Sequence, residues 1–70
     1  MTTIRFLSEQ ILTVFGSDLE DSDIYTEVFH KDEVIESLVI DFTDEFISLE
    51  FDSGCIIPNI PLSNIEILNV

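Results

Sequence analysis

The chain has 70 residues, so we expect residues 1–70 to form a single domain. Fifteen acidic and two basic residues give a formal net charge of −13, which disfavours direct binding to nucleic acid or to an anionic membrane surface. Hydrophobic residues make up 46% of the chain and include six phenylalanines, a composition that favours a folded chain over the disorder which high charge alone would predict.

Residues 4–15 fit two structures. Ile4, Leu7 and Ile11 recur at three- and four-residue steps, as on one face of a helix, and Gly16 follows as a helix-ending residue would. Residues 11–15, however, are mainly strand formers, and residues 8–10 suit a turn between two short strands. We favour a strand over 11–15; a helix over 4–15 would change the fold class from mainly β to α+β.

Residues 16–23 form the clearest loop, because Gly, Ser and Asp favour turn conformations. An EF-hand starting at Asp18 would need Gly at its sixth position and Glu at its twelfth, where this chain has Asp23 and Phe29. We interpret the loop as a solvated acidic segment and expect no metal and no other cofactor. Its acidic residues are Asp18, Glu20, Asp21 and Asp23.

The remaining sequence reads as strands joined by tight turns. Residues 24–30 and 34–42 are strand-like, with a turn at 31–33, and Leu38, Ile40 and Phe42 are expected on one face of the second strand. Residues 46–52 alternate, and their two expected faces are Ile47, Leu49 and Phe51 against Ser48, Glu50 and Asp52. This alternation is typical of half-buried antiparallel strands.

The C-terminal part begins with a hairpin turn at residues 52–54, where Gly54 can take a positive φ. Pro58 is expected to end the return strand that starts at Cys55, or to mark a sheet edge. Residues 61–64 predict one turn of 3₁₀ helix, and residues 65–70 a last strand. Residues 49–65 thereby resemble the ending of SH3-like barrels, which implies a small antiparallel meander or an SH3-like barrel. The aromatic groove residues with which SH3 domains bind proline-rich peptides are not evident, so the resemblance does not extend to that activity.

Nothing in the sequence specifies catalysis. Cys55 is the only thiol and His30 the only imidazole, and we expect Cys55 to be a small buried hydrophobe and His30 an exposed residue at a strand end. These two residues cannot complete a structural zinc site. With fifteen acids, two carboxylates lying close together carry no specific signal for acid–base chemistry. We therefore predict no catalytic residues and no enzymatic activity.

The expected compartment is the cytoplasm. One cysteine cannot form an internal disulfide, which fits a reducing environment. The first residues lack the pattern of a signal peptide, and no apolar run approaches the roughly 18 residues that a membrane-spanning helix needs.

The acidic residues are distributed along the whole chain, which favours a wide acidic surface on a folded domain over an acidic tail. A charge of −13 corresponds to roughly 22 Å of DNA duplex, and a folded chain of this length has a radius of gyration of about 11 Å. The charge density therefore approaches that of DNA. The residues proposed for this surface are Asp18, Glu20, Asp21, Asp23, Glu27, Glu36, Asp41, Glu50, Asp52 and Glu66.

In size and charge the chain resembles phage-encoded anti-restriction and anti-CRISPR inhibitors and the immunity proteins of nuclease toxins. The resemblance implies a non-enzymatic nucleic-acid mimic whose partner is a basic nucleic-acid-binding effector or nuclease. Such an interface also needs apolar anchors, for which Tyr25, Phe29 and Phe46 are candidates if they are exposed. The alternative is a structural or adaptor subunit of a cytosolic complex, and the sequence does not determine the oligomeric state.

Overall fold

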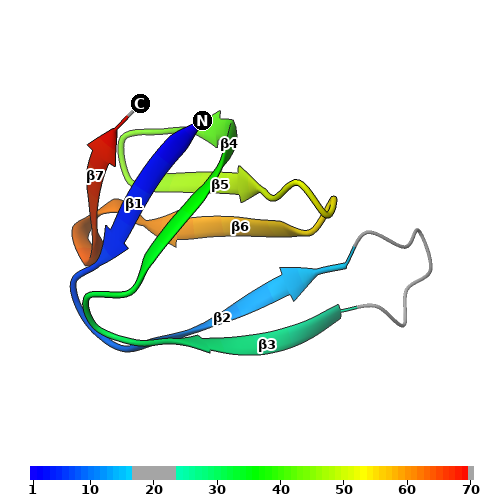
Figure 1. Cartoon of the computed structure of the whole chain (residues 1–70), viewed down its shortest axis with the longest axis horizontal. Coiled ribbons are helices and arrows are strands. Elements are labelled where there is room, and N and C mark those ends of the chain that lie inside the picture. The colour runs from blue at the N-terminus through cyan, green and yellow to red at the C-terminus, as the bar shows by residue number, and fades with distance from the viewer. Residues whose placement is uncertain (17–23, 70) are drawn as a thin grey trace.

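A computed structural model of the chain describes residues 1–16 and 24–69 (Figure 1). These residues form seven strands and one 3₁₀ turn. None of them belongs to a helix that is long and apolar enough to span a membrane. The elements are β1 (Thr2–Phe6), β2 (Gln10–Phe15), β3 (Ile24–Phe29), β4 (Val34–Phe42), β5 (Phe46–Glu50), β6 (Ile56–Pro61), η1 (Leu62–Asn64) and β7 (Ile65–Asn69).

All strand pairs are antiparallel, in the order β3-β2-β6-β5-β4-β1-β7. The sheet is rolled so that β1 lies between β4 and β7, while the β2–β3 hairpin projects to one side (Figure 1). The mainly β class is thus confirmed, as are the predicted hairpin turn, 3₁₀ turn and closing strand at the C-terminal end. The radius of gyration is 11.6 Å, close to the value expected for a compact chain of this length.

The helical alternative for residues 4–15 is wrong. Ile4 and Phe6 are fully buried and alternate with the half-buried Arg5, as in a strand. Leu7 and Ile11, which would continue the helical stripe, are exposed. The strand is favoured because Ile4 and Phe6 pack into the core and because β1 pairs with β4 on one edge and β7 on the other. These tertiary contacts outweigh the weak helical pattern.

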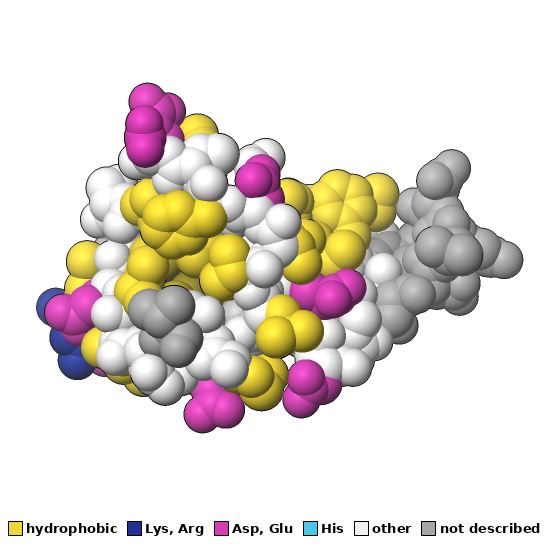
Figure 2. All heavy atoms as spheres, turned by 90° about the horizontal axis from the view of Figure 1, so that it is seen from above, with side chains coloured by type: hydrophobic (Ala, Val, Ile, Leu, Met, Phe, Trp, Pro, Cys, Tyr) yellow, Lys and Arg dark blue, Asp and Glu magenta, His cyan; other side chains and the backbone are white. Residues whose placement is uncertain are grey.

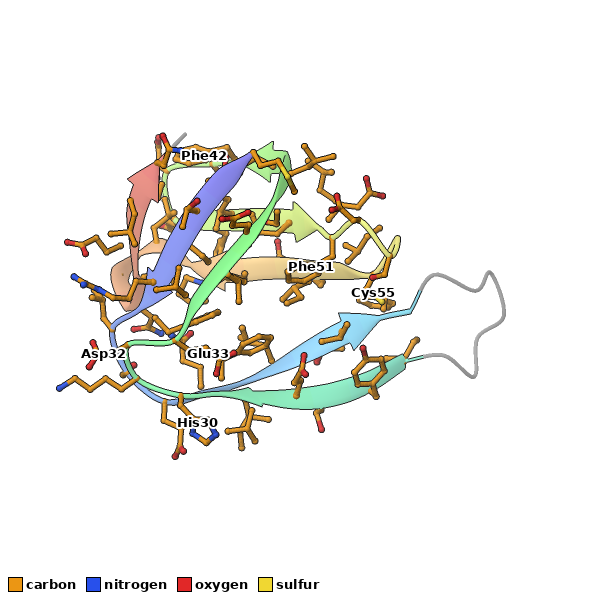
Figure 3. All side chains as sticks on the ribbon, viewed as in Figure 1. His30, Asp32, Glu33, Phe42, Phe51 and Cys55 are labelled. Carbon is orange, nitrogen blue, oxygen red and sulfur yellow. The ribbon has the colours of Figure 1, made fainter. Side chains whose placement is uncertain are left out.

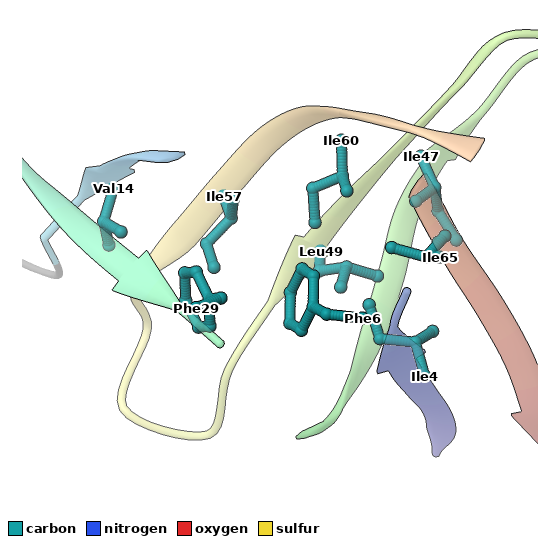
Figure 4. Packing of buried hydrophobic residues seen from close by; sticks show 9 residues of the cluster. All are labelled: Ile4, Phe6, Val14, Phe29, Ile47, Leu49, Ile57, Ile60 and Ile65. Atoms are coloured by element: carbon teal, nitrogen blue, oxygen red, sulfur yellow. The ribbon is translucent and has the colours of Figure 1, made fainter. Parts of the chain in front are cut away.

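The core consists of nine buried hydrophobic side chains from six strands (Figure 4). Leu49, Ile57 and Ile60 come from the β5–β6 hairpin, and Phe29 brings the end of β3 against Phe6 of β1. The other members are Ile4, Val14, Ile47 and Ile65. The projecting hairpin is therefore attached to the rolled sheet through the core.

A β-bulge in β4 overturns the predicted face of that strand. Register shifts between Val39 and Asp41, so that Leu38 lies opposite Glu50 whereas Phe42 lies opposite the buried Ile47. Cross-strand partners share a face of the sheet, which places Leu38 and Phe42 on opposite faces. The extra residue of a bulge inverts the alternation that follows it.

Pro58 does not end its strand, because β6 continues through it to Pro61. The register between β5 and β6 shifts in this region, and Asn59 has a φ of 56°. Proline is tolerated at such a bulge because no ladder hydrogen bond is required of it. The Asn59 amide instead donates to Oγ of Ser48, 3.1 Å away, and Ser48 is buried rather than on a solvated face as predicted.

Candidate protein-binding surfaces

The described carboxylates are spread over the surface. Nine of the eleven are exposed, and Glu33 and Glu50 are half-buried. On the face in Figure 2 the acidic side chains form separate groups, most of them toward the outline, with hydrophobic and other side chains between them. On this face the charge is therefore distributed, not gathered in one patch.

Few of these charges are compensated within the molecule. Arg5 pairs with Glu66 across β1 and β7, and Nδ1 of His30 lies 3.1 Å from Oε1 of Glu9. These are the two pairs between acidic and basic or imidazole side chains that the described part of the chain forms. The acidic surface thus keeps most of its charge available for an external cation.

The β4–β5 turn is rich in exposed acidic and aromatic residues. Asp41, Asp44 and Glu45 are exposed, and they lie in sequence between and beside Phe42 and Phe46, which are 57% and 38% exposed. Phe42 lies at the end of β4 (Figure 3). A hollow of about 350 Å³ adjoins the turn and is lined by Asp44, Glu45, Phe46, Pro61, Leu62 and Ser63.

Thr43 holds this turn in one shape. Its Oγ1 accepts hydrogen bonds from the amides of Phe46, at 3.0 Å, and Glu45, at 3.3 Å. The Thr43 amide donates to the carbonyl of Phe46, and the Leu62 amide donates to the carbonyl of Glu45, both at 2.9 Å. The turn is therefore fixed to η1, so its carboxylates and rings are presented with little conformational freedom to lose on binding.

A second apolar surface covers the outer face of the β2–β3 hairpin. The cross-strand pairs on this face are Ile11 with Val28, Thr13 with Thr26, and Phe15 with Ile24. None of these six side chains is charged, and Ile11 is 70% exposed. β3 is also the terminal strand of the sheet order, so one of its edges is unpaired within the described sheet.

The inner face of the hairpin borders a cleft of about 300 Å³. Its opposite wall is built by the start of β4 and by the connection between β5 and β6. Figure 3 shows Glu33 on the β4 side, and Phe51 and Cys55 on the β5–β6 side. The lining residues are Val14, Tyr25, Glu27, Phe29, Glu33, Ile35, Phe51, Ser53 and Cys55.

The structure separates several residues that the sequence grouped together. Glu50 ends β5 and Asp52 lies in the following turn, so the two do not form a row along one strand. Glu36 and Asp41 lie on β4, Glu27 on β3 and Glu66 on β7, all exposed. The described residues do not include the acidic loop, so the structure does not bear on its predicted surface residues or on the expectation that it binds no metal. These residues are Asp18, Glu20, Asp21 and Asp23.

The three proposed anchors differ in exposure. Tyr25 and Phe46 are 45% and 38% exposed. Phe29 is 4% exposed and stacks on Phe6, so it belongs to the core and does not meet the condition set for an anchor. Sequence reasoning missed Phe42, although its position between Asp41 and Asp44 is a signal that was available.

The cysteine and the histidine lie in different parts of the molecule (Figure 3). His30 is exposed after β3, as predicted, and faces Glu9. Cys55 is half-buried, packs against the core and borders the cleft. Within the described residues, no group of three His, Cys, Asp or Glu side chains is placed to hold a metal ion.

The described residues thus offer three candidate surfaces: the acidic and aromatic β4–β5 turn, the charge-free face of the β2–β3 hairpin, and the cleft with two carboxylates. No family model matches the chain, and comparisons with curated proteins and with solved structures likewise find no match.

Proposed function

We propose that this chain is a non-enzymatic acidic protein that binds the basic, nucleic-acid-binding surface of a larger cytoplasmic protein. The observation that carries the proposal is the β4–β5 turn, where three exposed carboxylates and two exposed phenylalanines lie within residues 41–46. No lysine or arginine lines the adjoining hollow. Inhibitors of the anti-restriction, anti-CRISPR and nuclease-immunity type act on targets of this kind.

The two components of the turn have different roles in such an interface. Carboxylates steer a basic partner toward the acidic protein and raise the association rate in a salt-dependent way. Desolvated aromatic anchors supply most of the affinity once contact is made. Phe46 lies with Asp44 and Glu45 at the hollow and is the anchor there, while Phe42, on the face of Ile47, is the anchor on the other side of the turn.

Overall dimensions support a role in replacing nucleic acid. The molecule extends 32 × 22 × 20 Å, and the net charge of the full 70-residue chain equals that of roughly 22 Å of duplex. A basic cleft that accommodates a duplex therefore meets a comparable charge over a comparable length. The carboxylates replace phosphates as the anions that lysine and arginine side chains contact.

Affinity capture from the native host tests the proposal. The captured protein is identified, and its binding to a labelled DNA or RNA duplex is then measured with increasing amounts of this chain over a salt series. We expect displacement of the duplex and a dissociation constant that rises with salt. A captured partner without nucleic-acid affinity, or binding that is independent of salt, contradicts the proposal.

The outer face of the β2–β3 hairpin favours a second candidate, a structural or adaptor subunit of a cytosolic complex. Ile11 and Val28 are exposed and paired on a face without charge, as in a contact buried by another subunit. Ile11→Ser with Val28→Ser separates the two functions. Loss of capture in this variant, with normal capture by Phe42→Ala, favours the adaptor function.

A further inference from the structure

We infer that the cleft beneath the β2–β3 hairpin binds a lysine or arginine side chain of the partner. This inference rests on the proposed function and names the chemistry that this part of the surface recognises. The supporting observation is the composition of the cleft. Apolar and aromatic side chains line it together with two carboxylates, and no lysine or arginine is among the lining residues.

The floor suits the aliphatic part of a long side chain. Val14 and Phe29 are buried at its base, and Tyr25 and Phe51 add aromatic surface. Lysine and arginine lay their methylene groups along apolar surface while their charged groups stay near water. An aromatic face also attracts a cation that lies over it.

The carboxylates suit the charged end of the same side chain. Glu27 on β3 is exposed and Glu33 beside β4 is half-buried. Oε1 of Glu33 accepts a hydrogen bond from the His30 amide at 3.1 Å, which holds this side chain in place and leaves Oε2 for a ligand. A guanidinium or ammonium group that enters the cleft can donate to these carboxylates, and such charge-assisted bonds are stronger than neutral ones.

The chain does not fill this position with a cation of its own. Arg5 is paired with Glu66, and Lys31 is not among the residues that line the cleft. A metal ion is a poor alternative, since the described residues provide no group of three ligating side chains. An organic cation with an apolar stem matches both parts of the cleft.

Cys55 provides a reporter for the test because it borders the cleft and is the only cysteine. Alkylation of its thiol by iodoacetamide is followed in the presence of N-acetyl-Gly-Arg-Gly-amide, the corresponding lysine peptide, and the citrulline peptide, a neutral isostere of the arginine peptide. We expect the arginine peptide or the lysine peptide to protect Cys55 from alkylation in a saturable way. Comparison of the two peptides shows which side chain the cleft prefers. The citrulline peptide should protect with roughly tenfold lower affinity. Amide chemical shifts of Val14, Tyr25 and Phe29 should change in parallel.

Matched variants separate the cleft from general charge. Glu27→Gln with Glu33→Gln removes two charges at the cleft, while the side-chain amide oxygen introduced by the second substitution still accepts the hydrogen bond from the His30 amide. Glu36→Gln with Glu66→Gln removes two exposed charges that do not line the cleft. We expect the first pair to weaken protection about tenfold or more and the second to change it less than about twofold.

Three results overturn the inference: no protection by either cationic peptide, equal protection by citrulline, or equal loss in the two variants. If the first variant fails to fold, the wild-type comparison of arginine with citrulline still decides. If the cationic peptides give no protection but a basic partner is captured, the proposed binding in the cleft is refuted and the proposed function is not. Protection by cationic peptides without such a partner refutes only the proposed function.

Discussion

The rings of Phe6 and Phe29 stack with their centroids 4.7 Å apart and their planes inclined by 23°. This contact joins β1, at the start of the chain, to the end of β3. The register between β2 and β6 contains one residue pair, Phe15 with Ile56. The β2–β3 hairpin, and with it one wall of the cleft, is thus held to the rolled sheet mainly by core packing.

Phe29→Ala should therefore destabilise the whole domain. Removing a buried phenylalanine ring costs about 3–5 kcal/mol, through lost burial and the cavity that remains. Phe42→Ala is the control, because that ring is 57% exposed and its removal should cost less than about 1 kcal/mol. Urea unfolding measures both values. A cost below that of Phe42→Ala would contradict a core role for Phe29.

Alternation and turn chemistry were enough to predict most of this fold. The spacing of Ile47 and Leu49 identified a buried strand face, and Gly54, with a φ of 89°, occupies the predicted turn. These are local signals, and a strand face or a glycine turn needs only local residues to form. The pairing of β1 between β4 and β7 joins distant segments, which local patterns do not encode.

The candidate sites were less predictable for a related reason. The bulge at Val39–Asp41 depends on the register with β5, and it moved Phe42 to the face of Ile47. The cleft joins Glu27 and Glu33 to Phe51 and Cys55 only after folding. The net charge led us to predict an acidic binding surface, whereas the position of each residue in the structure depends on tertiary contacts.

Arg5→Gln should destabilise the domain more than Glu66→Gln, although both remove the same ion pair. Losing the cation changes the net charge from −13 to −14, whereas losing the carboxylate changes it to −12. The pair is partly exposed, so its own contribution is about 0–1 kcal/mol, and the difference comes from self-repulsion of the domain. Urea unfolding at low and high salt measures it, and the difference should shrink as salt rises. An equal effect of the two variants at low salt would show that net charge does not limit stability.

Gly54→Ala should weaken the β5–β6 hairpin. A side chain costs about 1–2 kcal/mol in the left-handed region that Gly54 occupies. Asn59→Gly is the comparison, since Asn59 has a φ of 56° and glycine adopts that conformation without strain. Thermal unfolding should show a clear loss for Gly54→Ala and a smaller change for Asn59→Gly. Unchanged stability of Gly54→Ala would mean that the turn takes another conformation in solution.

Thr43→Val should loosen the β4–β5 turn while keeping the shape of the side chain. The substitution removes the hydroxyl that accepts hydrogen bonds from the amides of Glu45 and Phe46. Each of these bonds contributes about 1 kcal/mol to the stability of the turn. Hydrogen exchange of the Phe46 amide, which donates to this hydroxyl, should then accelerate about fivefold or more. Thr43→Ser retains the hydroxyl and should exchange nearly as the wild type does.

The same pair of variants connects this turn to binding. If a fixed turn presents Phe42 and Phe46 to the partner, Thr43→Val should weaken capture of that partner and Thr43→Ser should not. Phe42→Ala should weaken it further, because it removes the anchor itself at little cost in stability. Normal capture by both Thr43→Val and Phe42→Ala would remove the turn from the interface and leave the cleft and the hairpin face as the surfaces to test.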